Sequence, residues 1–146
     1  MALTALGAAG LVAGVMVFGR APGGLNTSLH QHPNIEIRLN GEVVVIPGDI
    51  GIDPARWQDH SMDAYGEMAA MSPLHTHDSS GQIHLEMGRW HACTLGDFFS
   101  VWGEPFDRGA LLSYVGSVSM TVDGIPNEEF RSLVLQDLQR IVITAG

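Results

Sequence analysis

The pattern that most constrains the fold is a β-hairpin between residues 35 and 46. Apolar and charged residues alternate in Ile35-Glu-Ile-Arg-Leu39, as they do in a strand with one buried face. Asn40-Gly41 comes next, and this pair is the strongest short signal for a two-residue hairpin turn. Glu42-Val-Val-Val-Ile46 then supplies the returning strand. We therefore predict an antiparallel hairpin here.

The later segments predict a small α+β domain. Thr94 has the position of a helix N-cap, Asp97 is an acid at the third helical position, and apolar residues continue to Gly103. Short apolar runs indicate further strands at 111–115, 117–122, 133–135 and 140–144. This order predicts a mainly antiparallel β-sheet with one short helix. A β-grasp-like arrangement is one way to assemble these elements.

The start of the 146-residue chain differs from the rest. Residues 2–18 carry no charge, and this run is at the short limit for crossing a bilayer. Residues 21–29 are mostly Gly, Pro, Asn, Thr and Ser, a composition typical of a flexible tether. We predict an N-terminal hydrophobic helix in residues 1–20 as a transmembrane anchor, a linker at 21–29, and one extracytoplasmic domain at 30–146.

Two alternatives to the anchor remain open, namely a cleaved signal and a buried globular helix. A secretory signal usually has a basic start, and no basic residue precedes this run. Gly10-Leu-Val-Ala-Gly14 matches the small-residue motif that packs membrane helices together. If the anchor forms, this motif suggests a membrane-protein partner.

The densest chemistry lies between residues 72 and 87. In an extended segment, residues i and i+2 face the same way, so His75 and His77 converge, as do His84 and Glu86. Asp78-Ser-Ser-Gly81 between the pairs has turn chemistry and folds one pair back against the other. Another such pair, His30 and His32, lies just before Pro33, which favours extended structure in the residue before it. We predict a metal site from these six residues.

The composition limits which partners and which metals are compatible with the predicted site. The formal net charge of −9 leaves no basic patch for phosphates, which argues against a nucleic-acid partner and favours a cation. Cys93 is the only cysteine, so a cysteine-rich zinc or iron–sulfur site is excluded. Imidazole suits copper, zinc, nickel and iron, and outside the cytoplasm copper and zinc are the leading candidates. Copper is slightly favoured if Met71 and Met87 offer thioethers. The alternative is a polar cluster in which Asp78 and Glu86 only hydrogen-bond the imidazoles.

The chain also resembles a family of small, largely uncharacterised bacterial and archaeal proteins. Two strings carry the resemblance, His75-Thr-His-Asp-Ser-Ser-Gly-Gln-Ile-His-Leu-Glu86 and Thr94-Leu-Gly-Asp-Phe-Phe-Ser-Val-Trp-Gly103. The resemblance covers roughly residues 30–146 and implies a membrane-anchored or exported domain with a metal-related role. It also implies that the six predicted ligands are recurrent polar positions. No reaction comes with it, and the chain departs from the family pattern at residues 136–140.

Three functions compete on this evidence. The first is a membrane-anchored copper- or zinc-binding protein that acts as a carrier or an accessory subunit. The second is a metal-dependent enzyme with an open His-ligated site and Glu86 as general base. The third is a structural subunit of a membrane complex without metal. A closed shell of four imidazoles, or of three imidazoles and a carboxylate, favours the first function. An open shell in a cleft favours the second, and dispersed imidazoles favour the third.

Overall fold

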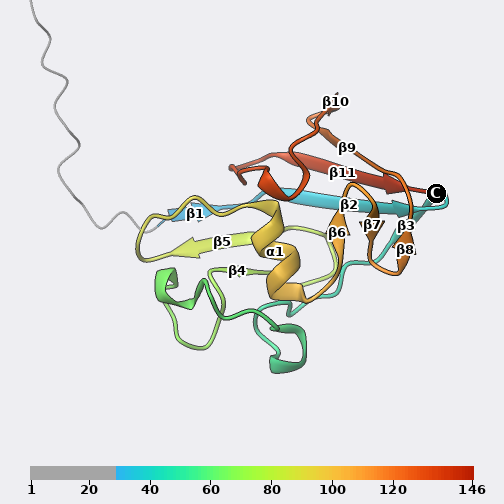
Figure 1. The fold of residues 1–146 in the computed structure, drawn as a ribbon. Helices are drawn as coiled ribbons and strands as arrows, with labels where there is room; N and C mark the ends of the chain where they lie inside the picture. The colour runs from blue at the N-terminus through green and yellow to red at the C-terminus, as the bar shows by residue number, and fades with distance from the viewer. Residues whose placement is uncertain (1–28) are drawn as a thin grey trace, which may run out of the picture.

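The computed structural model describes residues 29–146, and the predicted anchor and nearly all of the linker lie outside them. Its largest sheet has five strands in the order β10-β9-β11-β2-β3. Their bounds are Ile125–Pro126, Val118–Val122, Arg140–Ala145, Asn34–Leu39 and Glu42–Val44. The sheet is mixed, because β11 pairs in parallel with β2 and all other neighbours are antiparallel. Figure 1 shows β2 and β11 side by side.

The predicted hairpin is confirmed as β2 and β3. Asn40 and Gly41 both have positive φ, 52° and 82°, as a two-residue hairpin turn requires. Along β2 the apolar side chains alternate toward the core, and Ile35 and Ile37 are fully buried. Ile141 and Ile143 on β11 are buried in the same way. Burial of one face of each strand fixes the register between them.

A second sheet carries the histidines. Its strands are β1, β5 and β4, with bounds Leu29–Gln31, His84–Met87 and Leu74–His75, in the order β1-β5-β4. Both pairings are antiparallel. β1 continues through Pro33 into β2, and Ile35 N–H donates to the Gly81 carbonyl at 2.9 Å. This bond joins the hairpin of β4 and β5 to the larger sheet.

The predicted helix is confirmed as α1, Leu95–Trp102. Thr94 and Asp97 form a reciprocal capping box, and Gly103 ends the helix with a left-handed φ of 83°. Phe98 and Phe99 are fully buried. α1 packs against β4 and against the short 3-10 helix η3, Phe130–Ser132, so one helical face covers the end of the histidine sheet.

Two strand predictions are wrong in detail. Residues 111–115 form two short strands, β7 (Ala110–Leu111) and β8 (Tyr114–Val115), because Leu112 turns the chain at a φ of 53°. Together with β6 (Phe106–Asp107) they make a small third sheet. Residues 133–135 make only one isolated bridge, Thr94 to Val134. The neighbouring chain there turns into α1, so it offers no strand to extend the pairing.

The described region is therefore an α+β arrangement of mixed and antiparallel sheets with one α-helix. Two further 3-10 helices, η1 (Pro54–Arg56) and η2 (Asp63–Tyr65), lie in the long connection from β3 to β4. Between residues 29 and 146, no helix is both long enough and apolar enough to cross a membrane. The predicted anchor at residues 1–20 lies outside this range.

Candidate metal centre

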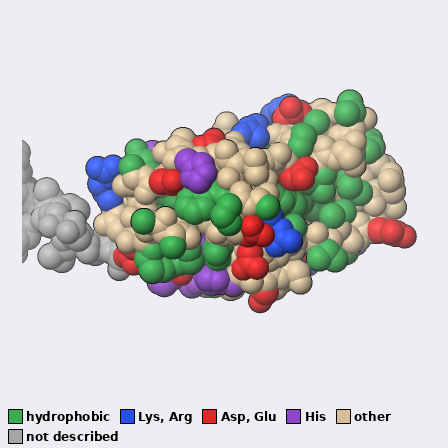
Figure 2. All heavy atoms as spheres, turned by 90° about the horizontal axis from the view of Figure 1, so that it is seen from below, with side chains coloured by type: hydrophobic (Ala, Val, Ile, Leu, Met, Phe, Trp, Pro, Cys, Tyr) green, Lys and Arg blue, Asp and Glu red, His purple; other side chains and the backbone are tan. Residues whose placement is uncertain are grey.

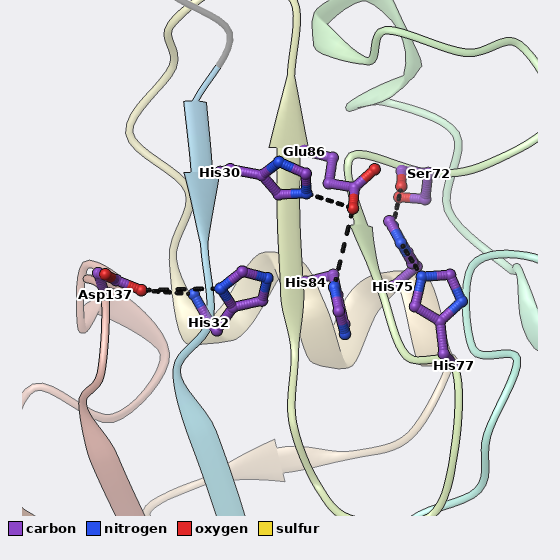
Figure 3. Close-up of polar contacts among 8 residues, drawn as sticks. All are labelled: His30, His32, Ser72, His75, His77, His84, Glu86 and Asp137. Carbon is purple, nitrogen blue, oxygen red and sulfur yellow. Dashed lines mark hydrogen bonds and ion pairs between the residues drawn. The ribbon is translucent and has the colours of Figure 1, made fainter.

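The hairpin of β4 and β5 places two imidazoles directly opposite each other. His75 pairs with His84, and Leu74 pairs with Leu85. The apolar members of the hairpin, Leu74, Leu85 and Met87, are fully buried, so His84 and Glu86 emerge together on the other face of β5. Figure 3 shows His75, His77, His84 and Glu86 gathered beside these strands.

His75 is held in one tautomer. Its side chain is fully buried, and its Nδ1–H donates to the Ser72 carbonyl at 2.9 Å. A carbonyl only accepts hydrogen bonds, so the neutral ring keeps its lone pair on Nε2. That nitrogen lies 3.2 Å from His77 Nε2. The Ser72 carbonyl therefore turns the His75 Nε2 lone pair toward a second imidazole, where it accepts a hydrogen bond from His77 Nε2–H.

His84 carries an unpaired buried nitrogen. Its Nδ1 has no hydrogen-bond partner anywhere in residues 29–146, although the atom is buried. Glu86 Oε1 lies 3.7 Å from this nitrogen, which is too long for a hydrogen bond. The His84 ring lies 4.5 Å from the His77 ring and 5.4 Å from the His75 ring, between centroids. A buried polar atom without a partner is costly and calls for an explanation.

Glu86 connects this group to β1. His30 lies opposite Glu86 in the β1–β5 pairing, and its Nε2–H donates to Glu86 Oε1 at 2.5 Å. Burial raises the pKa of the Glu86 carboxyl, but the His30 hydrogen bond and the nearby imidazoles outweigh it, so this pKa lies below its usual value. Glu86 is therefore a carboxylate at neutral pH.

His32 approaches from the same strand. Its backbone N–H donates to Asp137 Oδ1 at 2.8 Å, and its Nδ1 lies 4.0 Å from the same oxygen. The His32 ring meets the His84 ring edge-on, with centroids 4.8 Å apart. In Figure 3 the other ring nitrogen of His32 points toward His84. All six predicted residues thus lie on one face of the β1-β5-β4 sheet.

The electrostatics favour neutral imidazoles at the buried end. Burial lowers the pKa of His75, and for His84 burial and then the neighbouring imidazoles lower the pKa. Metal ions bind the neutral ring and the ionised carboxylate, so both protonation states match those a cation requires. His77 and His30 are exposed, and Figure 2 shows imidazoles at the molecular surface.

The geometry is close to that of a bound ion. One ligand atom from each of His75, His77, His84 and Glu86 lies within 4.8 Å of the other three. Zinc–nitrogen distances of about 2.0 Å place neighbouring ligands about 3.3 Å apart in a tetrahedral site. The His75–His77 separation of 3.2 Å already matches this spacing. The His84 and Glu86 ligand atoms lie within 4.8 Å of the others, so their side chains would have to move closer to reach the same spacing.

The cavity beside the site is small. It lies against His75 and Glu86, has a volume of about 10 Å³, and is also lined by Glu67, Met68, Met71 and Ser72. A single water molecule needs about 10 to 15 Å³. This cavity therefore has room for a water or an ion and none for an organic substrate.

Of the two methionines considered as ligands from the sequence, Met87 is excluded and Met71 lies next to the site. Met87 lies on the opposite face of β5, fully buried, with its Sδ 3.5 Å from Cys93 Sγ. Burial raises the pKa of the Cys93 thiol to about 12, so it is a protonated core residue. Met71 lines the small cavity, so it is the methionine of the pair that lies next to the site.

Sequence reasoning missed Ser72 and Asp137. Ser72 acts through its backbone carbonyl, which no residue-type pattern reveals. Asp137 is 105 positions from His32 and reaches it only because β11 returns beside β2. His60 and His91 lie outside the cluster, beside Trp57 and Tyr65 respectively.

Comparison with protein-family models, curated proteins and solved structures finds no match to this chain.

Proposed function

We propose that this protein binds a copper or zinc ion through His75, His77, His84 and Glu86, which we call the inner site. The buried, unpaired Nδ1 of His84 carries the proposal. Folding leaves this atom without a partner next to the His75 lone pair and the Glu86 carboxylate. A cation bound among the three groups supplies the missing partner and offsets the cost of burial.

We propose binding rather than catalysis as the role of the inner site. Three imidazoles and one carboxylate complete a four-coordinate shell, which is typical of structural and storage sites rather than of open catalytic ones. The cavity against His75 and Glu86 has a volume of only about 10 Å³, too small to enclose an organic substrate. A carrier or an accessory subunit needs such a shell and no substrate pocket.

The ligand chemistry favours a transition metal, and copper and zinc are the two ions that we propose. Neutral imidazoles bind both ions well, whereas calcium and magnesium prefer shells made of oxygen. Met71 beside the cavity supports reduced copper, since a thioether is a soft ligand. The Glu86 carboxylate supports zinc equally.

The location of the protein is also a proposal. The uncharged run at residues 2–18 and the tether after it support a domain held outside the membrane by an N-terminal anchor. Cell fractionation tests this: the full-length chain should remain with membranes after a high-salt wash and be released by detergent. Recovery of the full-length chain in the aqueous fraction would contradict the anchor.

For the fold, we propose a β-grasp-like arrangement of the larger sheet. Its support is the central parallel pair, β2 and β11, with β3 and β9 paired outside them. α1 lies between these strands in the chain order. An experimental structure that placed β2 and β11 apart would remove this proposal.

Metal analysis tests the function directly. Full-length protein purified without a histidine tag should hold at least one equivalent of zinc or copper after loading and desalting. The His77→Ala variant should lose most of this metal, since His77 is an exposed ligand whose removal spares the core. The His60→Ala variant is the matched control, because His60 lies outside the cluster, and it should bind like the wild type. Absence of metal from loaded wild-type protein would refute the proposal.

A further inference from the structure

A second cluster of ligand atoms adjoins the inner site. His30, His32 and His84 each offer one ligand atom within 4.8 Å of the others. His30 and His32 come from the β1 end of the sheet, whereas the inner site is built mainly from β4 and β5. We call His30 and His32 the outer pair. The two clusters share His84, and Glu86 contacts members of both.

We propose that the outer pair forms a second cation position next to the inner site, so that the histidine face holds two ions bridged by the Glu86 carboxylate, with His84 as a ligand of the inner ion. This inference rests on the proposed function, since it assumes an ion in the inner site. Glu86 has two oxygens with about four lone-pair positions, so one carboxylate has the capacity to contact two ions. Two-metal sites commonly place their ions about 3.5 to 4 Å apart.

The hydrogen bond between His30 and Glu86 marks the second position. His30 Nε2–H donates one hydrogen bond to Glu86 Oε1 across 2.5 Å. An ion bound between these atoms takes the place of that hydrogen, which transfers through solvent to His30 Nδ1, so that the ring stays neutral. The imidazole then donates its lone pair to the ion, and the carboxylate remains ionised.

Asp137 prepares His32 for the same position. The His32 Nδ1 edge faces Asp137 Oδ1, at 4.0 Å, and the backbone bond at 2.8 Å fixes the residue beside that carboxylate. The remaining ring nitrogen points to the cluster (Figure 3). At 4.0 Å the His32 ring does not hydrogen-bond Asp137, so the backbone bond is the contact that orients the residue.

Charge indicates which ions occupy both positions together. Two divalent ions repel each other about four times as strongly as two univalent ions at the same separation. Glu86 is the one carboxylate shared by the two clusters. Reduced copper, a univalent ion for which imidazole and thioether are suitable ligands, is therefore the ion expected at double occupancy.

The ligand side chains of the two positions differ in their exposure to solvent. The His30 and His32 side chains are 61% and 35% exposed, whereas among the inner ligands His75 is fully buried, His84 and Glu86 are 18% and 21% exposed, and His77 alone is exposed. An ion at the outer position therefore exchanges with solution more readily than one at the inner site. For a carrier, the outer pair is the end at which metal is accepted and released.

A titration with Cu⁺ under anaerobic, reducing conditions tests the proposal, with full-length protein in detergent and a competing chromophoric chelator. The wild type and the His60→Ala control should each bind two ions. The variant with His30→Ala and His32→Ala should bind one, tightly, and its exposed substitutions leave the core intact. The His77→Ala variant should keep the weaker ion and bind the inner one at least about tenfold less tightly.

Three outcomes would overturn the proposal in distinguishable ways. A single Cu⁺ in the wild type that survives loss of the outer pair means that only the inner site exists, and the proposed function stands. A single Cu⁺ that disappears with the outer pair means that these histidines complete one shared site. Absence of Cu⁺, Cu²⁺ and Zn²⁺ from the wild type refutes both the second position and the metal-binding function.

Discussion

Replacing His84 with Phe should separate metal binding from stability. The His84 side chain is only 18% exposed, and its Nδ1 is buried without a partner. Leaving such a group unpaired costs about 1 to 3 kcal/mol. Phe keeps a planar ring between the His75 and His77 rings and carries no polar atom to bury. The metal-free variant should therefore gain about 1 to 3 kcal/mol in free energy of unfolding.

The same substitution removes a ligand from the inner site. Loss of an orienting partner alone typically weakens metal binding about 10- to 100-fold, so loss of a direct ligand should cost at least roughly 100-fold. In the presence of a chelator, urea unfolding followed by circular dichroism should show the gain in stability. With zinc added, the wild type should be stabilised and the variant should not. At a free zinc concentration about 100 times the dissociation constant, the wild type gains about 2.7 kcal/mol.

The His60→Phe variant is the control for adding an aromatic ring. His60 is exposed and lies outside the cluster, so its replacement should change the free energy of unfolding by less than about 0.5 kcal/mol and leave zinc binding intact. The reasoning fails if metal-free His84→Phe protein is less stable than the wild type and still binds zinc with unchanged affinity. That result would mean that His84 has a structural role and no ligand role.

Three further predictions concern the surroundings of the site. Burial lowers the pKa of His75 in the folded chain, so the unfolded chain binds more protons as the pH falls below about 6.5. The free energy of unfolding of the metal-free protein should therefore fall by up to about 1.4 kcal/mol per pH unit in this range. Urea unfolding at pH 7.5, 6 and 5 measures this loss. Glu86→Gln should weaken zinc binding by at least about tenfold in calorimetry, with an unchanged circular dichroism spectrum; unchanged affinity would exclude the carboxylate as a ligand. Gly81→Ala should cost more than about 2 kcal/mol, because φ is +80° and the new Cβ would lie 2.2 Å from the Ile35 carbonyl oxygen; a neutral result would show that the loop relaxes freely.

Local patterns predicted the local structure well. Two of these patterns depend only on residues close in sequence, namely the alternation from Ile35 to Leu39 and the turn at Asn40-Gly41. The structure contains both the strand and the turn. The same is true of the Thr94 and Asp97 capping box, which needs only three residues of spacing. The His75 and His84 pairing followed from turn chemistry in the eight residues between them. In each case the stabilising contact lies within one turn or one hairpin.

Predictions failed where the neighbour of a segment was unknown. Leu133 and Leu135 are buried and alternate with the exposed Val134, as in a strand, yet only one bridge forms because the adjacent chain becomes α1. Parallel pairing of β2 with β11 was likewise invisible, since hydrophobic alternation is the same in parallel and antiparallel strands. The Ser72 carbonyl could not be found for a different reason, because every residue has a carbonyl.

The position of β5 explains why the histidines meet. As the middle strand of the β1-β5-β4 sheet, it places His84 and Glu86 between residues that are far apart in the chain. The strand period of two was enough to predict that the two members of each pair face the same way. The order of the strands in the sheet places all three pairs on the same face. A core-filling sequence would place apolar side chains here, and this chain instead leaves a buried imidazole nitrogen unpaired. Because the unpaired nitrogen makes the metal-free protein less stable, the cluster is better explained by the proposed ligand binding than by a role in folding.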